Sequence, residues 1–334
     1  MHIPTPSSFF PALLPLFLPL TTALLPTHLI YEAAVGTWYE NLAVRASGSI
    51  LLTEITAPNL YMIDPLSPNP KPTLVHTFTS ALWLVGITET TPDIFHLVAA
   101  NGTLATLSST PGSNRIFQVA FPPGRDTPEI KLTATLPEAQ LLNGLTTLNP
   151  TTVLAADSAK GVVWAVDVET GDSRIAIADP LMLPTSAFPL GINGLHIRDQ
   201  TLYFTNSALD LFAKIPIHPD GTAAGSAVNI SHAPADASYD DFAISENSDL
   251  AFLVTNTGNS LEDVGLRGEP QVIVAGNLNS TELAEPTSAA FGRGEGGEGV
   301  VYVTTGGGLV APVNGDETVG AQLVAVDIRG LGRR

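Results

Sequence analysis

The sequence predicts an all-β fold, a six-bladed β-propeller with a central channel, from three observations. Helical periodicity is nearly absent after residue 30. Short runs of β-branched and aromatic residues occur in pairs, and Gly, Pro, Asn or Asp bound each pair as in a hairpin. Equivalent runs recur about every 50 residues, a period typical of a propeller blade and too long for most solenoid repeats.

The strand runs have a regular spacing. The clearest lie at residues 49–53, 152–156, 201–205, 250–254 and 300–304. When Ile50, Ile94, Val153, Leu202, Leu250 and Val300 are taken as equivalent positions, successive differences are 44, 59, 49, 48 and 50 residues. Six such units fill the chain from about residue 35 to its end. We expect Leu29 to Tyr31 to pair with the last blade and close the ring, which removes an exposed strand edge. A two-sheet sandwich is the alternative, although it requires no fixed period.

The N-terminal segment differs from the rest of the chain. Residues 9–25 are apolar, prolines interrupt them, and the small residues Thr21 to Ala23 offer a cleavage site. We interpret residues 1–23 as a signal peptide and residues 24–334 as one propeller domain. An uncleaved anchor and a disordered apolar tail are the alternatives. A signal peptide predicts a secreted or lumenal protein, with N-glycosylation sequons at Asn101, Asn229 and Asn279.

Composition limits the classes of partner. The formal net charge is −18, from 14 Lys and Arg against 32 Asp and Glu, and no basic run offsets it. Such a surface repels phosphate groups, so we expect no binding to nucleic acid and none to a membrane once the signal is removed. The chain contains no cysteine, which excludes disulfides, Cys-ligated zinc and thiol nucleophiles. We expect a monomer that takes a small-molecule substrate.

A second repeat of polar residues precedes the strands. Nine or ten residues before the equivalent strand position of a blade lie Glu40, Val85, Asn143, Asn193 and Asp240, and Thr287 holds the corresponding place in the last blade. Equivalent positions of propeller blades lie at one height around the axis, so these residues are predicted to form a ring at one mouth of the channel. Two carboxylates and two amide oxygens are hard ligands that suit Ca²⁺ or Mg²⁺.

Each ring residue also has a plainer interpretation. Asn-Gly, found at 143–144 and 193–194, is the strongest dipeptide for a type I′ turn, and Asp or Glu before a strand is commonly a solvated loop residue. The phase of four polar positions, spaced by nearly whole blades, favours a shared site. We therefore take Glu40, Asn143, Asn193 and Asp240 as candidate catalytic residues, and as metal ligands if a metal is bound.

The phased segments resemble the gluconolactonase/SMP-30-like superfamily of six-bladed propellers. The segment from Trp38 to Arg45, followed by residues 49–53, is similar to a fungal branch that includes hetero-Diels–Alderases of meroterpenoid and tropolone-sesquiterpenoid pathways. The resemblance covers roughly residues 35 to 328 and places the metal ligands of the superfamily on the four candidate residues above. This sequence departs from the lactonase pattern in two places. Asn41-Leu42 follows the glutamate where those enzymes have Gly-Pro, and Tyr239-Asp240-Asp241 replaces Pro-Asp-Gly, so that Asp241 is an alternative inward residue.

Further residues are candidates for substrate binding. Trp38, Tyr39 and Trp83 lie near two ring positions and would form an apolar wall, with packing between blades as the alternative role. His196 follows Asn193 by three residues and is a candidate general base, or else a buried structural histidine. Asp241 and Thr287 complete this candidate set.

Three functions remain open. The first is a [4+2] hetero-cycloaddition that joins a quinone methide or enone to a terpene alkene, a reaction that needs a shaped apolar pocket, a few hydrogen-bond donors and no cofactor. The second is a lactonase or related hydrolase that depends on Ca²⁺ or Mg²⁺. The third is a propeller that binds without catalysis.

Overall fold

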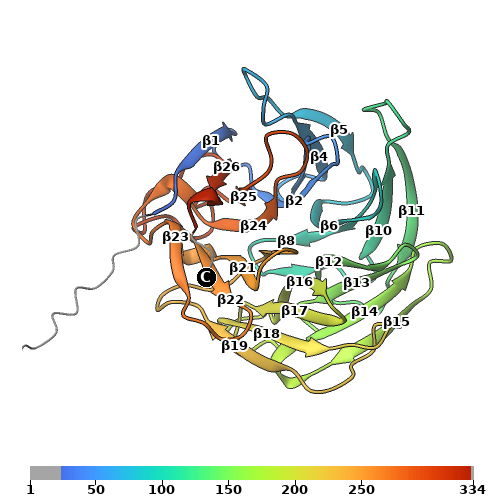
Figure 1. The fold of residues 1–334 in the computed structure, drawn as a ribbon. Coiled ribbons are helices and arrows are strands. Elements are labelled where there is room, and N and C mark those ends of the chain that lie inside the picture. Colours follow the sequence, from blue (N-terminus) through green and yellow to red (C-terminus); the bar gives the residue numbers. More distant parts are fainter. Residues whose placement is uncertain (1–23, 332–334) are drawn as a thin grey trace, which may run out of the picture.

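Six four-stranded antiparallel sheets surround a central axis in the computed structural model, which describes residues 24–331 (Figure 1). The chain runs around the ring once, and each sheet is one blade. The predicted all-β propeller with six blades is therefore confirmed. The strand runs predicted at 49–53, 152–156, 201–205, 250–254 and 300–304 each form the second strand of a blade.

The blades follow the chain in order. Blade 1 contains β2 (Tyr39–Val44), β3 (Ile50–Glu54), β4 (Asn59–Ile63) and β5 (Thr73–Thr77). Blade 2 contains β6 (Trp83–Thr91), β7 (Ile94–Ala100), β10 (Arg115–Ala120) and β11 (Glu129–Thr135), with a small inserted hairpin of β8 (Gly102–Thr103) and β9 (Ser108–Ser109). Blade 3 contains β12 (Leu142–Asn149), β13 (Thr152–Asp157), β14 (Val162–Asp167) and β15 (Ser173–Ala178).

The second half repeats this pattern. Blade 4 contains β16 (Ile192–Arg198), β17 (Thr201–Asn206), β18 (Leu211–Pro216) and β19 (Val228–His232). Blade 5 contains β20 (Phe242–Ile244), β21 (Leu250–Val254), β22 (Ser260–Gly265) and β23 (Val272–Gly276). Blade 6 contains β24 (Pro286–Phe291), β25 (Val300–Thr305) and β26 (Gln322–Asp327). Short 3-10 turns occur at η1 (Pro180–Met182), η2 (Asn256–Gly258), η3 (Thr281–Leu283) and η4 (Ile328–Gly330).

The two ends of the chain close the ring together. Strand β1 (Thr27–Glu32) is the outer strand of blade 6, where it pairs antiparallel with β26, and Figure 1 shows the blue strand beside the red one. The predicted pairing of Leu29 to Tyr31 with the last blade is confirmed. This arrangement satisfies the backbone of β26 on both sides and leaves no unpaired edge between the two ends.

The hydrophobic core lies between neighbouring blades. Val98 and Ile116 of blade 2 pack with Leu145 and Val153 of blade 3, and Leu154 of blade 3 packs with Phe204 of blade 4. Each sheet is therefore buried on both faces. This explains why the strand sequences are continuous apolar runs and do not alternate between apolar and polar residues.

The inner strands of blades 2 to 5 approach so closely that only glycine fits between them. A Cβ at Gly86 would lie 2.7 Å from the backbone nitrogen of Leu145, and one at Gly194 would lie 2.7 Å from Cα of Asp241. A Cβ at Gly144 would overlap the carbonyl oxygen of Asn193. These glycines set the width of the ring at the axis.

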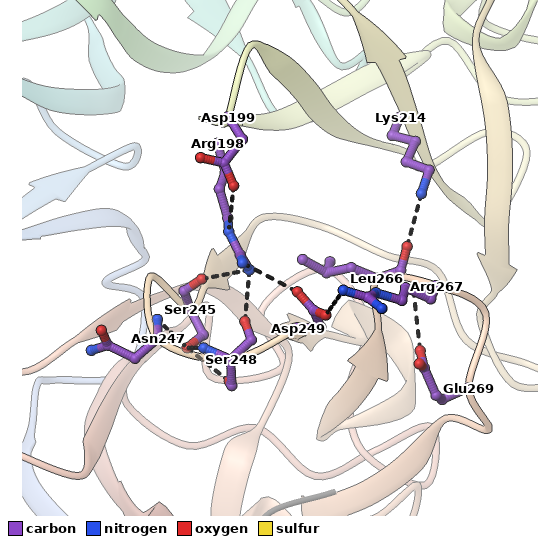
Figure 2. Close-up of polar contacts among 10 residues, drawn as sticks. All are labelled: Arg198, Asp199, Lys214, Ser245, Asn247, Ser248, Asp249, Leu266, Arg267 and Glu269. Atoms are coloured by element: carbon purple, nitrogen blue, oxygen red, sulfur yellow. Dashed lines mark hydrogen bonds and ion pairs between the residues drawn. The ribbon is translucent and has the colours of Figure 1, made fainter.

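Arg198 joins blades 4 and 5 on the face of the ring where β16 ends (Figure 2). Its guanidinium donates to the carbonyl oxygens of Ser245 at 3.0 Å and Ser248 at 2.6 Å, and pairs with Asp249 at 3.1 Å. Arg267 pairs with the other carboxylate oxygen of Asp249 at 2.6 Å. Planar guanidinium groups suit such multiple acceptors, so the cluster fixes the β20–β21 loop to blade 4.

The predicted signal peptide lies outside the described residues and stays a prediction. Within residues 24–331, no helix is long and apolar enough to cross a membrane. Of the predicted glycosylation sites, Asn229 and Asn279 are exposed, whereas Asn101 is half-buried beside the inserted hairpin of blade 2. Their glycosylation also stays a prediction.

Candidate functional site

A cavity opens at one mouth of the ring. It encloses an empty volume of about 870 Å³, part of it open to solvent. Residues that immediately precede or begin the inner strands form its buried end, and loops between blades form its rim. A concave, mostly apolar cavity with a few polar groups is the usual form of a small-molecule site.

Four predicted site residues line this cavity together. Glu40, Asn143, Asn193 and Asp240 come from blades 1, 3, 4 and 5, and Val85 of blade 2 lies beside them. All five are at least nine-tenths buried. The register of the repeat therefore places these side chains at one cavity, as the spacing predicts.

A local backbone irregularity turns these residues toward the cavity. The pairing register shifts between Tyr39 and Asn41 in blade 1, between Leu142 and Leu145 in blade 3, and between Ile192 and Leu195 in blade 4. The Asn-Gly dipeptides at 143–144 and 193–194 thus lie in bulges of the inner strands β12 and β16, not in hairpin turns. A bulge redirects one side chain, and the glycine permits the close approach of the next blade.

Glu40 is held by an indole. Nε1 of Trp38 donates to Oε2 of Glu40 at 2.7 Å. Burial, opposed by the indole hydrogen bond and assisted by the nearby carboxyl groups of Asp241 and Glu285, raises the pKa of Glu40 to about 7. Glu40 therefore exchanges its proton near neutral pH.

Asp240 is the second carboxyl group of the cavity. Nδ2 of Asn256 donates to its Oδ2 at 3.1 Å. Burial and then the charge of Glu40 raise the pKa of Asp240 well above its usual range, against the hydrogen bonds from Asn193 and Asn256. Because the two carboxyl groups repel each other when both are ionised, the pair retains a proton near neutral pH.

The two asparagines differ in their environments. Nδ2 of Asn193 donates to the hydroxyl of Ser207 at 2.9 Å, and Ser207 donates onward to the carbonyl oxygen of Tyr239 at 2.8 Å. This chain fixes the amide of Asn193 across blades 4 and 5. Asn143 is slightly more exposed and also faces the cavity.

Glu285 anchors part of the rim. Its carboxylate accepts hydrogen bonds from the backbone nitrogens of Val310 at 3.2 Å and Ala311 at 2.9 Å. Burial raises the pKa of Glu285, and these backbone donors oppose the shift. The loop between β25 and β26 is thereby held over the cavity.

The rim is apolar. The hairpin of blade 2, the segment before β16 and the β25–β26 loop contribute Leu104, Leu107, Phe188, Leu190 and Val310. Phe188 and Val310 are exposed to solvent, as expected for residues at an open mouth. The cavity thus combines a polar buried end with apolar upper walls.

The remaining candidates divide between this cavity and other places. Trp38 and Trp83 line the cavity. Tyr39 is buried between blades 1 and 6, and Thr287 donates to its carbonyl oxygen at 2.7 Å, so both join blades. The structure does not bring Tyr39, His196, Asp241 or Thr287 to the cavity.

Asp241 lies beside the axis instead of facing the cavity. Its Oδ2 accepts from Nδ2 of Asn41 at 2.8 Å and from the hydroxyl of Ser288 at 3.2 Å, and its Oδ1 lies 3.3 Å from Nε2 of His196. Asn41, Ser288 and His196 border a second hollow at the other end of the inner strands, lined also by Thr146 and Phe291. Asp241 therefore belongs to a polar cluster at the axis, outside the first cavity.

Sequence reasoning missed several cavity residues. Asn256 and Glu285 lie beside strands at places that do not repeat between blades, whereas Ser207 follows β17 as Ser158 follows β13, a repeat that sequence reasoning did not use. Leu104, Leu107 and Phe188 lie in loops of unequal length. Of these residues, only Glu285 lies close to a position of the predicted polar repeat, since it precedes Thr287 by two residues.

The donor set fits a hard divalent cation. Glu40 and Asp240 supply carboxylate oxygens, and the amide nitrogen of Asn193 donates to Ser207, which leaves its oxygen as the free donor atom. Within residues 24–331 no group of three or more His, Asp or Glu side chains is placed to hold a metal ion, so a cation here needs the amide oxygens as well.

The fold and the cavity together define a six-bladed β-propeller with a cavity at one mouth of the ring. No protein-family model matches the chain. The chain is 27% identical over 307 residues to a "Putative hetero-Diels-Alderase" of Phoma sp, and the alignment covers 84% of this chain and 86% of the relative. It is also 27% identical over 346 residues to the "Putative hetero-Diels-Alderase asR5" of Sarocladium schorii, and this alignment covers 92% of this chain and 84% of the relative.

Solved structures share the fold. A luciferin-regenerating enzyme superposes with a TM-score of 0.66 at 14% identity, over 92% of this chain and 96% of the other. A "putative gluconolactonase" superposes with a TM-score of 0.60 at 13% identity, over 92% and 94%. At these identities the likeness shows the fold alone. The predicted resemblance, to gluconolactonase-like propellers in fold and to proteins named as hetero-Diels–Alderases in sequence, is confirmed in these terms.

Proposed function

We propose that the chain is an enzyme that accelerates a [4+2] hetero-cycloaddition in the cavity, between an enone or quinone methide and a terpene alkene. The observation that carries this proposal is a cavity with apolar walls whose buried end holds two carboxyl groups of raised pKa. The names of the two sequence relatives support it. The product class would place the enzyme in meroterpenoid or tropolone-sesquiterpenoid biosynthesis.

The reaction makes modest chemical demands. One C–C and one C–O bond form, three π bonds become one, and no proton, electron or leaving group is exchanged with the protein. Catalysis therefore comes from holding both partners within reacting distance and from stabilising negative charge that develops on the heterodiene oxygen. The apolar rim serves the first need, because it buries a hydrocarbon partner.

The carboxyl pair serves the second need. A neutral carboxylic acid donates a hydrogen bond, whereas a carboxylate only accepts one. Since the pair of Glu40 and Asp240 retains a proton near neutral pH, it offers a donor at the buried end of the cavity. The amide nitrogen of Asn143 lies at the same end and adds a neutral donor.

A lactonase is the second candidate, and the four hard oxygen donors at one cavity favour it. In that case Glu40, Asn143, Asn193 and Asp240 would hold Ca²⁺ or Mg²⁺. A bound divalent ion supplies polarisation of an ester carbonyl and a more acidic water. The carboxyl groups would then be needed ionised, so the two candidates require opposite protonation states.

An assay with two substrate classes separates the candidates. The protein is incubated with a panel of lactones, and separately with a quinone-methide precursor and a terpene alkene. We expect cycloadduct above the uncatalysed background and no lactone hydrolysis, as measured by chromatography with mass detection. Lactone hydrolysis without cycloadduct formation would favour the second candidate and overturn the first.

A further inference from the structure

The cavity holds acidic side chains and no basic one. Glu40, Asp240 and Glu285 are among the residues that line it, whereas no Lys, Arg or His of the described part of the chain does so. The protein as a whole reinforces this charge, since its formal net charge is −18. Buried charged groups in proteins are normally paired, so three carboxyl groups at one cavity without a cationic side chain require an explanation.

One oxygen of Glu40 is available to an occupant of the cavity. Oε2 accepts from the indole of Trp38, but Oε1 has no hydrogen bond within residues 24–331. Glu40 is only 7% exposed, yet Oε1 is not one of the side-chain atoms that are both buried and unpartnered. Since Glu40 lines the cavity, this oxygen is an acceptor that a ligand can reach there.

The other two carboxyl groups add charge beside this acceptor. Oδ2 of Asp240 accepts from Nδ2 of Asn256, and both oxygens of Glu285 accept backbone N–H groups of the β25–β26 loop. Both carboxyl groups interact with that of Glu40 through their charges. Glu40 therefore offers the free acceptor, and its neighbours make the potential around it more negative.

Aromatic side chains surround the acceptor. Trp38, Trp83, Phe188 and Tyr239 line the cavity, and the indole of Trp38 is in direct contact with the carboxyl group of Glu40. The faces of aromatic rings attract cations, and the attraction is stronger where water is excluded. The apolar walls also bury the hydrocarbon part of a ligand. This combination suits an ammonium group attached to an apolar body.

We propose that the cavity binds organic ammonium ions with an apolar body, and that Oε1 of Glu40 accepts the hydrogen bond from the ammonium group. A charge-assisted hydrogen bond of this kind is about twice as strong as a neutral one. Carboxylates and phosphates of the same shape are rejected, because no cation lines the cavity to receive them. The inference rests on the proposed function only in using the same cavity, and it adds that apolar amines compete with the substrates.

Three compounds with one phenylbutyl skeleton test this selection by charge. Binding of 4-phenylbutylamine, 4-phenylbutanol and 4-phenylbutanoate to the wild-type protein is measured by calorimetry. The buffer contains EDTA and is held at about pH 8, where the amine is charged. We expect the amine to bind about tenfold more tightly than the alcohol, and the carboxylate not to bind. An amine that binds no more tightly than the alcohol, or a carboxylate that binds as tightly as the amine, would overturn the proposal.

A matched pair of variants tests the role of Glu40. Glu40→Gln removes the charge and keeps the shape, so it should bind the amine about tenfold more weakly and the alcohol as before. Glu262→Gln removes a buried carboxyl group outside the cavity and should keep the preference for the amine. An unchanged preference in folded Glu40→Gln would also overturn the proposal. If that variant did not fold, the three compounds would still decide with the wild-type protein. No substrate is present, so these outcomes do not depend on whether cycloaddition occurs.

Discussion

Replacing Glu40 with alanine is expected to lower the rate of cycloaddition by about 10²–10³-fold, the usual loss when one preorganised donor is removed. The matched variant Glu40→Gln keeps a neutral donor in place of the carboxylic acid. We expect it to retain most of the activity and to lose the dependence of the rate on pH around 7, where Glu40 exchanges its proton. A hydrolase that needs an ionised Glu40 would instead be inactivated by both substitutions. Initial rates of the purified variants decide between these outcomes.

The same variants have a second readout in stability. Because burial raises the pKa of Glu40 to about 7 in the folded protein, the folded state binds more protons than the unfolded state between the ordinary value of 4.5 and about 7. The stabilisation from this proton is fully present below pH 4.5 and is lost as the pH rises through 7. Above pH 7, Glu40→Gln should therefore have a larger free energy of unfolding than the wild type, by on the order of 3 kcal/mol, and a higher melting temperature. Glu262, buried outside the cavity with a pKa of about 6, provides the control: Glu262→Gln should leave the pH profile of activity unchanged.

Gly194→Ala is expected to cause the largest loss of stability. The new Cβ would lie 2.7 Å from Cα of Asp241 and would overlap its carboxylate, and the backbone of the neighbouring blade cannot retreat without opening the ring. Overpacking of this kind costs about 3 kcal/mol of unfolding free energy. The melting temperature should fall clearly, as measured by calorimetry.

Gly330→Ala is the matched control for this substitution. Its Cβ would meet only a methyl carbon of Leu25, at 3.9 Å, and we expect the melting temperature to change little. If Gly194→Ala melted like Gly330→Ala, the close contact between inner strands would not be what sets the width of the ring.

The part of the architecture that repeats could be predicted from the sequence. Each blade places its second strand in a similar buried environment, so residues such as Ile50, Val153 and Leu202 recur in phase. The closing strand β1 was predictable because an all-β ring leaves one edge that needs a partner. The polar positions Glu40, Asn143, Asn193 and Asp240 were found for the same reason, since they share one place in the repeat.

The rest of the site has no repeat to reveal it. The rim residues Leu107 and Phe188 lie in loops that differ in every blade, and Asn256 reaches Asp240 from the turn after β21. Asp240 and Asp241 are adjacent in sequence, yet only the backbone path just before β20 decides which one faces the cavity. The raised pKa of Glu40 depends on Asp241 and Glu285, which lie in other blades, and on burial by the assembled ring.

The dependence of the cycloaddition rate on pH, measured across pH 7 with and without EDTA, tests the central claim most directly. A neutral carboxyl donor in the pair of Glu40 and Asp240 predicts a rate that falls as the pH rises through about 7 and is the same in EDTA. A rate that rises over this range and is abolished by EDTA would contradict the account, because it would mean that the cavity works with ionised carboxylates around a metal ion.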